Sequence, residues 1–285
     1  MKCKICNTEV SLKLKGLIYL SRFDGEVYQC PNCDYLQVFP ADWLEEAYTE
    51  SIAITDTGIV ARNLLFVKRI TILLTVIDFQ LRIPAVFLRV FKSFVRYFCS
   101  KRFNKYRLNI LDFGGGYGLL VRMLRDVGFN AEWRDLYTKN LFARGFEGKS
   151  KNYDCILSFE VLEHLENPLR EFDNIFLGFR PNLFIFSTLL YGEEVPDKNW
   201  WYYSPETGQH IGFYNERTLR FIADKYGYFY TSIDSGFHIF SKKRLHSDII
   251  RFFVLRSDYF FPTVAKVYRS LTLTDNEKMI KSIFD

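Results

Sequence analysis

The sequence predicts an α/β protein with a doubly wound parallel sheet, a small cysteine-rich unit before the sheet and a helical linking region between the two. Three observations carry this prediction. Short apolar runs alternate with amphipathic segments from Leu108 onward, a glycine-rich turn follows the first of these runs, and two cysteine pairs lie near the N-terminus. A length of 285 residues fits one moderately large domain with a small accessory unit.

The composition excludes disordered and fibrous classes. Hydrophobic residues make up 48% of the chain and charged residues 25%, so a large core can be buried. The formal net charge of +5 comes from 38 basic and 33 acidic residues scattered along the chain. Because so mild a charge does not demand a polyanion, nucleic acid is not the expected partner.

The N-terminal residues and the most apolar stretch of the sequence predict the cellular compartment and whether the chain crosses a membrane. The opening Met1-Lys2-Cys3 lacks the apolar run of a secretion signal, which predicts a cytoplasmic protein. The stretch 64–98 is interrupted by seven charged residues, so no transmembrane segment is expected. Binding of its basic amphipathic helices at a membrane surface stays open beside plain helix packing.

Four cysteines form two C-x2-C pairs, Cys3 with Cys6 and Cys30 with Cys33. Two residues between paired thiolates let one tight turn present both sulfurs to a single ion, and the intervening residues can form a hairpin with turns at Gly16 and Gly25. The four thiolates therefore predict a structural zinc site without an open coordination position. Disulfides or free thiols are the alternative, which a reducing compartment disfavours.

Four regions are expected: a zinc-binding module at 1–40, a helical linking region at 41–107, an α/β domain at 108–241 and a helical tail at 242–285. Periodicity predicts helices at 43–48, 63–75 and 86–98, and one or two helices in the tail. In the α/β domain the expected strands are 108–113, 130–135, 153–159, 182–188, 228–233 and 236–241, and the expected helices lie near 117–127, 138–144, 168–178 and 215–226.

A glycine-rich loop follows the first strand of the α/β domain. Asp112 ends the apolar run, and Gly114, Gly115, Gly116 and Gly118 then open a helix. Such a loop lets backbone approach a ligand closely, although a plain strand–helix turn is the alternative. The dinucleotide pattern G-x-G-x-x-G is not met, because a leucine follows Gly118 where the third glycine belongs.

Asp135 ends the next expected strand, where a carboxylate can accept hydrogen bonds from ribose hydroxyls; an exposed surface carboxylate is the alternative. Here the chain resembles class I S-adenosylmethionine-dependent methyltransferases, whose acidic residue followed by G-x-G-x-G is matched from Asp112 to Gly118. The segment 153–168 resembles the family's fourth-strand segment. The resemblance covers 108–241 and implies a Rossmann-like sheet. It also implies a cofactor site formed by Asp112, Gly114, Gly115, Gly116, Gly118, Asp135, Ser158, Phe159 and Glu160.

Two carboxylates and an imidazole follow the third clear strand, as Glu160, Glu163 and His164. A similar E-x2-E-H in some quinone O-methyltransferases holds a divalent ion, so magnesium or zinc is conceivable here. The alternative, which we favour over magnesium, is that Glu163 and His164 only buttress the loop.

An aromatic segment precedes the expected helix at 215–226 and surrounds one histidine. Trp201, Tyr202 and Tyr203 are the expected acceptor contacts, and His210 is the expected general base, with Glu163 and His164 as competing catalytic residues. A similar segment occurs in small-molecule methyltransferases with an N-terminal zinc module, including sugar C-methyltransferases. An aromatic lid packed on a structural histidine is the alternative.

The sequence therefore predicts a methyltransferase that acts on a small polar metabolite, such as a nucleotide-linked sugar or a surface-glycan precursor. RNA methylation is one alternative, but the N/D-P-P-Y type of signature is absent after Leu157. A non-catalytic cofactor-binding module is the other, and the intact loop from Asp112 to Gly118 argues against it.

Overall fold

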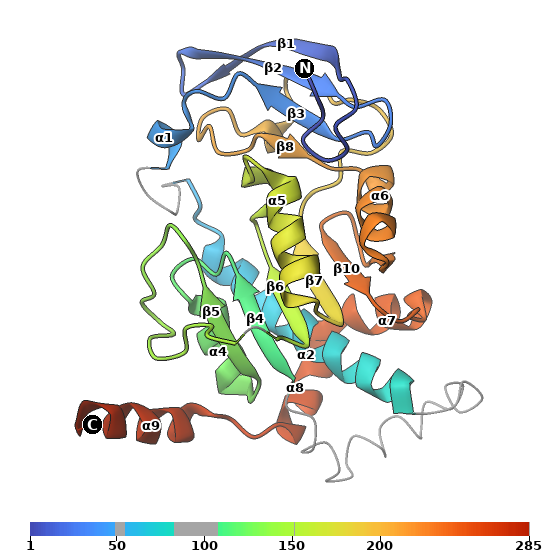
Figure 1. Ribbon diagram of the computed structural model, residues 1–285. Coiled ribbons are helices and arrows are strands. Elements are labelled where there is room, and N and C mark those ends of the chain that lie inside the picture. The colour runs from blue at the N-terminus through green and yellow to red at the C-terminus, as the bar shows by residue number, and fades with distance from the viewer. Residues whose placement is uncertain (49–54, 83–107, 151, 285) are drawn as a thin grey trace. The chain divides into compact units, whose positions relative to one another are not determined.

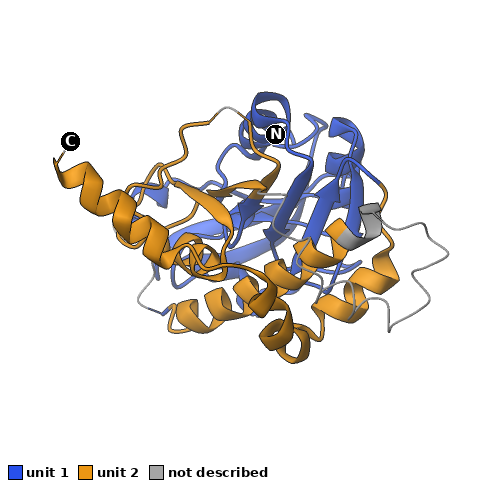
Figure 2. Ribbon diagram, turned by 90° about the horizontal axis from the view of Figure 1, so that it is seen from below, with its two compact units in different colours: residues 1–55, 157–243 blue, residues 56–156, 244–285 orange. Residues whose placement is uncertain are grey.

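The computed structural model describes residues 1–48, 55–82, 108–150 and 152–284 (Figure 1). Two compact units divide the chain (Figure 2). Unit 1 contains residues 1–55 and 157–243, and unit 2 contains residues 56–156 and 244–285. Each unit is therefore built from two stretches that are distant in sequence. The expected helix at 86–98 lies outside the described residues.

The strands are β1 (Ser11–Tyr19), β2 (Phe23–Gln29), β3 (Leu36–Phe39), β4 (Asn109–Phe113), β5 (Asn130–Arg134), β6 (Cys155–Ser158), β7 (Leu183–Ser187), β8 (Gly212–Phe213), β9 (Phe229–Ser232) and β10 (Phe237–Ser241). The α-helices are α1 (Leu44–Ala47), α2 (Ile59–Arg82), α4 (Leu119–Val127), α5 (Pro168–Asp173), α6 (Glu216–Tyr226), α7 (Ser247–Val254), α8 (Ser257–Val264) and α9 (Thr272–Phe284). A π-helical turn at Asn174–Phe179 extends α5, and 3-10 turns lie at Leu162–His164, Trp201–Tyr203 and Ala265–Val267.

Six strands follow the order β5-β4-β6-β7-β10-β9, with β4 parallel to β5 and β10 antiparallel to both β7 and β9. All six lie within two residues of the expected bounds. β4, β6, β7 and β10 are short, mainly apolar runs, which make their bounds easy to recognise. The α/β prediction is confirmed.

The N-terminal strands of unit 1 pair in the order β1-β2-β3-β8, antiparallel throughout. The expected turns at Gly16 and Gly25 are wrong. The chain reverses after β1 through Leu20 and Ser21, both of which have positive φ. Gly16 lies where the register of β1 shifts, and Gly25 lies inside β2. Glycine thus marks a β-bulge here and not the hairpin turn.

The core of this sheet includes residues from the aromatic segment. Trp43 stacks on Tyr19 with ring centroids 4.4 Å apart, and its indole nitrogen donates to the Gly208 carbonyl. Tyr203 and Phe213 are fully buried in the same cluster. The N-terminal strands and the segment around 200–213 therefore share one hydrophobic core.

The expected helix near 138–144 is absent, and this prediction is wrong. Polar side chains compete with helical hydrogen bonds there. Asp135 accepts from the backbone of Tyr137 and Thr138, and Asn140 accepts from the backbone of Ala143. The resulting turns hold the segment in a compact non-helical form.

Helices from both ends of the unit 2 sequence pack together. The long α2 packs on α4, α7 and α8, and the tail forms three helices where one or two were expected. No helix among the described residues is long and apolar enough to cross a membrane.

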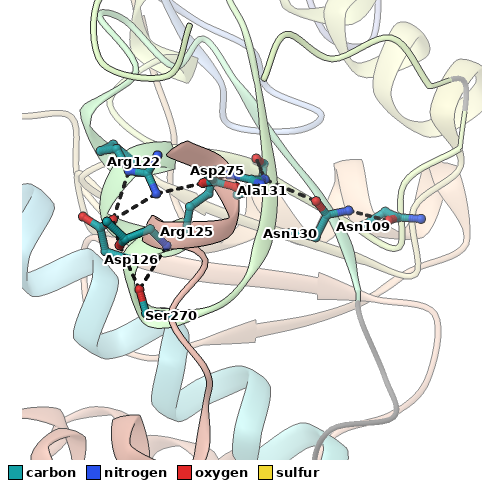
Figure 3. A network of polar contacts seen from close by, with 9 residues as sticks. Asn109, Arg122, Arg125, Asp126, Asn130, Ala131, Ser270 and Asp275 are labelled. Atoms are coloured by element: carbon teal, nitrogen blue, oxygen red, sulfur yellow. Dashed lines mark hydrogen bonds and ion pairs between the residues drawn. The ribbon is translucent and has the colours of Figure 1, made fainter. Parts of the chain in front are cut away.

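A buried ion pair fastens α9 to α4 (Figure 3). Arg125, which is 6% exposed, donates to both carboxylate oxygens of Asp275 at 2.7 and 2.8 Å. The same guanidinium donates to the Ala131 carbonyl and lies 3.7 Å from the ring centre of Phe146. One arginine therefore joins α9 to α4, β5 and the segment that follows β5.

Replacing Asp275 by alanine should lower the free energy of unfolding by ~3–5 kcal/mol, because Arg125 would keep a buried charge without its partner. Urea unfolding measures the loss. Glu216→Ala is the matched control, since Glu216 pairs with Arg220 on the exposed surface of α6 and should cost about 1 kcal/mol or less. Equal losses in the two variants would contradict the assigned role of the buried pair.

Candidate functional site

The four paired cysteines come together in unit 1. Cys3 and Cys6 precede β1, and Cys30 and Cys33 lie between β2 and β3. All four sulfurs lie within 4.8 Å of one another; Cys3 is 3.6 Å from Cys33, and Cys6 is 3.3 Å from Cys30. Sulfurs bound to one tetrahedral zinc at ~2.3 Å stand about 3.8 Å apart, so the arrangement suits that ion.

The two cysteine pairs are held by the same turn. Asn7 and Asp34 directly follow the pairs, and both have a left-handed backbone with φ near 60°. The Asn7 amide donates to the Cys3 carbonyl at 3.0 Å, and the Asp34 amide donates to the Cys30 carbonyl at 2.9 Å. Asparagine and aspartate tolerate this conformation, so the sequence C-x2-C-N/D is a signal for the turn.

The glycine loop of unit 2 depends on positive φ. Gly114, Gly116 and Gly118 have φ of +74°, +52° and +85°, which L side chains rarely adopt. The amides of Gly114 and Gly115 donate to the Arg134 carbonyl, which ties the loop to the end of β5. Glycine is therefore favoured at these three positions because the backbone has positive φ there.

The loop has one crowded and one open position. A Cβ on Gly115 would meet Asp112 at 2.8 Å and Trp133 at 2.9 Å, whereas a Cβ on Gly116 would meet nothing within 4 Å. The Trp133 indole donates to the Gly116 carbonyl at 2.7 Å and fixes the loop from behind. Gly116 is thus the point where a ligand can approach the backbone.

Asp135 shapes the same loop. One carboxylate oxygen accepts from the Gly116 amide at 3.0 Å, and the other accepts from the amides of Tyr137 and Thr138, both at 2.8 Å. A carboxylate offers about four acceptor positions, so Asp135 can still accept from a ribose hydroxyl. It therefore has a structural role that the sequence did not reveal.

Asp112 is 2% exposed at the end of β4. Burial raises its pKa to about 7, and the nearby charge of Asp135 contributes to the shift. Near neutral pH the carboxyl is therefore partly protonated and can donate as well as accept a hydrogen bond.

The remaining expected cofactor contacts lie at the end of β6 and directly after it. Ser158 is buried, and the Phe159 ring centre is 5.6 Å from that of Phe237. Glu160 is exposed with φ of +56°, and its amide donates to the Ser187 hydroxyl at 2.7 Å. That hydroxyl donates in turn to the Glu160 carboxylate at 2.6 Å. Ser187 therefore fixes the turn after β6, and the sequence analysis did not single it out.

A second cluster in unit 1 joins Glu163, His164 and His210, whose ligand atoms lie within 4.8 Å of one another. His164 Nδ1 is 3.1 Å from the Gln209 carbonyl, and His210 Nδ1 is 2.7 Å from the Tyr202 carbonyl. Because a carbonyl only accepts, Nδ1 carries the proton in both rings. Both Nε2 atoms therefore keep a lone pair for a proton or a metal ion.

Burial controls the charge of this cluster. Glu163 is fully buried, which raises its pKa to about 8, and the charge of Glu160 adds to the shift. Neither carboxylate oxygen of Glu163 has a hydrogen-bond partner among the described residues. Burial also lowers the pKa of His164 to about 3 and lowers that of His210. Both imidazoles are neutral at physiological pH.

The three expected acceptor contacts differ in exposure. Trp201 is 70% exposed, whereas Tyr202 and Tyr203 are 4% and 0% exposed. The Tyr202 hydroxyl accepts from the Leu189 amide, and the Tyr203 hydroxyl donates to the Pro196 carbonyl. Trp201 alone of the three presents a large accessible surface.

His238 is arranged differently from the two clustered histidines. It is fully buried, with Nε2 3.0 Å from the Thr188 carbonyl and Nδ1 3.3 Å from the Tyr230 hydroxyl. Both ring nitrogens are therefore engaged, and His238 supports the structure.

Residues 86–233 match the family described as "Methyltransferase domain". This match spans more than half of the 285 residues. The chain belongs to the methyltransferase-domain family. It is a class I methyltransferase whose cofactor is S-adenosylmethionine. The enzyme class predicted from the glycine loop is confirmed.

Solved structures resemble this methyltransferase in part. The methyltransferase domain of bacterial CtHen1 is 19% identical over 48% of this chain and 90% of its own, with a TM-score of 0.31. The mitomycin 7-O-methyltransferase MmcR is 15% identical over 47% of this chain and 48% of its own, with a TM-score of 0.35. The small RNA methyltransferase HEN1 is 19% identical over 57% and 27%, with a TM-score of 0.35. No curated protein matches the sequence.

Proposed function

We propose that this methyltransferase methylates a hydroxyl or acidic carbon of a small polar metabolite, of the class of nucleotide-linked sugars or surface-glycan precursors. The observation that carries the proposal is that a neutral imidazole at His210 and the exposed indole of Trp201 both contact the Tyr202 ring, with ring centroids 4.6 and 5.3 Å away. An aromatic face suits the apolar face of a sugar ring, and a neutral imidazole suits removal of a proton.

The main task of the protein in this reaction is to position the methyl donor and the acceptor. S-adenosylmethionine supplies an electrophilic methyl group, whose bond to sulfur breaks as its bond to the acceptor forms. Holding the two reactants in line supplies ~7–11 kcal/mol. His210 Nε2 accepts the proton that the acceptor loses, and the Tyr202 carbonyl stabilises the resulting imidazolium through Nδ1.

A labelled methyl group tests the acceptor class. The enzyme is incubated with methyl-labelled S-adenosylmethionine and either nucleotide-linked sugars or total RNA, and the products are separated by size. Label in the small-molecule fraction supports the proposal. Label confined to RNA would replace it with the RNA alternative, and no transfer to either pool would overturn the acceptor assignment.

We also propose that the glycine loop and Asp135 bind the cofactor. Asp135→Ala should weaken S-adenosylmethionine binding by about 10- to 150-fold, because a charge-assisted hydrogen bond worth ~1.5–3 kcal/mol is removed. Calorimetry measures the affinity, and a nicotinamide dinucleotide should not bind. Asp224→Ala, an exposed carboxylate change on α6, is the control. Unchanged affinity in Asp135→Ala would refute this site.

A divalent ion is the second candidate role for the Glu163, His164 and His210 cluster. The Nε2 atoms of His164 and His210 are oriented by carbonyls bound at Nδ1, and they lie beside the buried Glu163 carboxylate, which has no hydrogen-bond partner in the described part of the chain. This donor set suits zinc or a similar transition metal better than magnesium. An ion there would lower the pKa of an acceptor hydroxyl, and His210 would then be a ligand and not a base.

Metal content separates the two roles. If the cluster binds an ion, Glu163→Gln should lower the zinc content by about one equivalent per chain while the four cysteines keep theirs. The matched control is Glu193→Gln, which changes an exposed carboxylate of the same unit and leaves the cluster intact. Equal metal content in Glu163→Gln and the wild type would exclude the ion and leave His210 as the base.

A further inference from the structure

Gln209 joins the single-turn helix α1 to the histidine cluster of unit 1. Its side chain is 8% exposed, and its Nε2 donates to the Ala47 carbonyl at 2.8 Å. Ala47 is the last residue of α1, where a helical carbonyl has no partner within the helix. The side-chain amide of Gln209 therefore anchors the backbone of residue 209 to the end of α1.

The preceding residue, Gly208, is anchored at the start of the same helix. Trp43 lies directly before α1, and its indole nitrogen donates to the Gly208 carbonyl at 2.8 Å. A Cβ on Gly208 would meet the Trp43 ring at 2.9 Å, so only glycine allows this close approach. Both ends of α1 thus hold the backbone that leads into His210.

This backbone also orients the second imidazole of the cluster. The Gln209 carbonyl accepts from His164 Nδ1 at 3.1 Å. The same carbonyl belongs to the planar peptide unit that ends at the His210 nitrogen. The rings of His164 and His210 have their centres 4.8 Å apart. A displacement of residue 209 would therefore move both imidazoles.

Tyr48, which directly follows α1, contacts the cluster as well. Its ring meets that of His164 edge-on, with centres 6.2 Å apart, and its hydroxyl donates to the Gln209 carbonyl at 3.5 Å. His164 is thus held by α1 in two ways, through the Gln209 carbonyl and through the Tyr48 ring.

A glutamine is a costly choice for a buried position, because its amide loses water and must find a hydrogen-bond partner. An apolar side chain of similar size would fill the space, but it would not fix a direction as a hydrogen bond does. We propose that Gln209 and Tyr48 are positioning residues, which use α1 to hold the His164 and His210 imidazoles in place. This inference rests on the proposed function, since it gives their orientation a role in methyl transfer.

Gln209→Met in the full chain tests the inference, because methionine keeps the length of the side chain and removes the amide. NMR of labelled ring nitrogens should show the Nδ1–H tautomer for both histidines in the wild type, and a mixture of tautomers for His164 in the variant. The kcat of methyl transfer should fall about tenfold while S-adenosylmethionine affinity stays unchanged. If the cluster binds zinc, the variant should bind that ion about 10- to 100-fold more weakly.

Gln37→Met is the matched control. Gln37 is a buried glutamine of β3 in the same unit, and it is 1% exposed. Its side chain donates to the Lys2 carbonyl at 3.1 Å and accepts from the Lys4 amide at 2.9 Å. This variant should lose thermal stability as Gln209→Met does, but it should keep the wild-type tautomers and kcat.

Tyr48→Leu gives a second test if Gln209→Met does not fold, because Tyr48 is 37% exposed and its replacement should be tolerated. It should shift the His164 tautomers in the same direction. Unchanged His164 tautomers in an ion-free cluster, or unchanged zinc affinity in a loaded one, would overturn the inference. The same shift in Gln37→Met would also overturn it.

The NMR measurement needs no acceptor, so it decides the inference separately from the proposed function. A shift in Gln209→Met, in a protein whose wild type transfers no methyl group to small molecules, would refute the proposed function and support the positioning of the histidines. Unshifted tautomers in an active enzyme would do the reverse.

Discussion

Replacing Cys30 by serine should remove about one zinc equivalent per chain and unfold the N-terminal sheet of unit 1, because the four thiolates form a closed ligand set. Structural zinc contributes an apparent ~10–16 kcal/mol to the folding of small modules, which exceeds what the short strands β1 to β3 can supply alone. Metal analysis and thermal unfolding measure the two effects together.

Loss of the zinc should also weaken contacts that the cysteine turns make with other parts of unit 1. The Thr218 hydroxyl donates to the Cys33 carbonyl at 2.8 Å, and the Tyr191 hydroxyl donates to the Asp34 carbonyl. Thr218 belongs to the first turn of α6, so this helix loses a tether when the cysteine turn loosens. We expect faster amide exchange at the start of α6 in Cys30→Ser.

Cys155→Ser provides the control for the zinc prediction, because Cys155 is buried on β6 and belongs to no cluster of metal-binding side chains among the described residues. This variant should keep its zinc. Full zinc content in Cys30→Ser, or an equal loss in Cys155→Ser, would show that the four cysteines do not hold the metal.

Most strands of the α/β domain could be predicted from the sequence because they are buried, mainly apolar runs, whereas β5 and β9 contain polar residues at exposed or half-buried positions. β7 and β10 are buried at every position, which leaves no alternation to confuse the pattern. The segment after β5 failed for the opposite reason. Its helix-like apolar spacing was outweighed by Asp135 and Asn140, whose side chains bind nearby backbone amides.

The candidate sites were predicted in parts but not as assemblies. Glu163 and His164 were recognised in one motif and His210 in another, and only the fold shows that the three side chains meet. The carbonyls that orient the imidazoles come from Tyr202 and Gln209. A backbone carbonyl leaves no signal in the sequence, so this positioning could not be predicted.

Replacing His210 by asparagine should lower kcat by about 10²- to 10⁴-fold while S-adenosylmethionine affinity stays unchanged, because a positioned base contributes that much to a proton transfer. The reason is local: the Tyr202 carbonyl fixes Nδ1–H at 2.7 Å and leaves Nε2 to accept the proton. Single-turnover rates and calorimetry measure the two quantities separately.

His238→Asn distinguishes catalysis from structure, because His238 is more deeply buried than His210 and both of its ring nitrogens are bonded. Its loss should lower the thermal stability of unit 1 and reduce turnover and cofactor binding together. His210→Asn should instead separate kcat from affinity and from Tm. If His210→Asn behaved like His238→Asn, the imidazole would belong to an aromatic lid. If His210→Asn kept full activity on the true acceptor while Glu163→Gln or His164→Asn lost activity, the residue whose replacement abolished activity would accept the proton instead of His210.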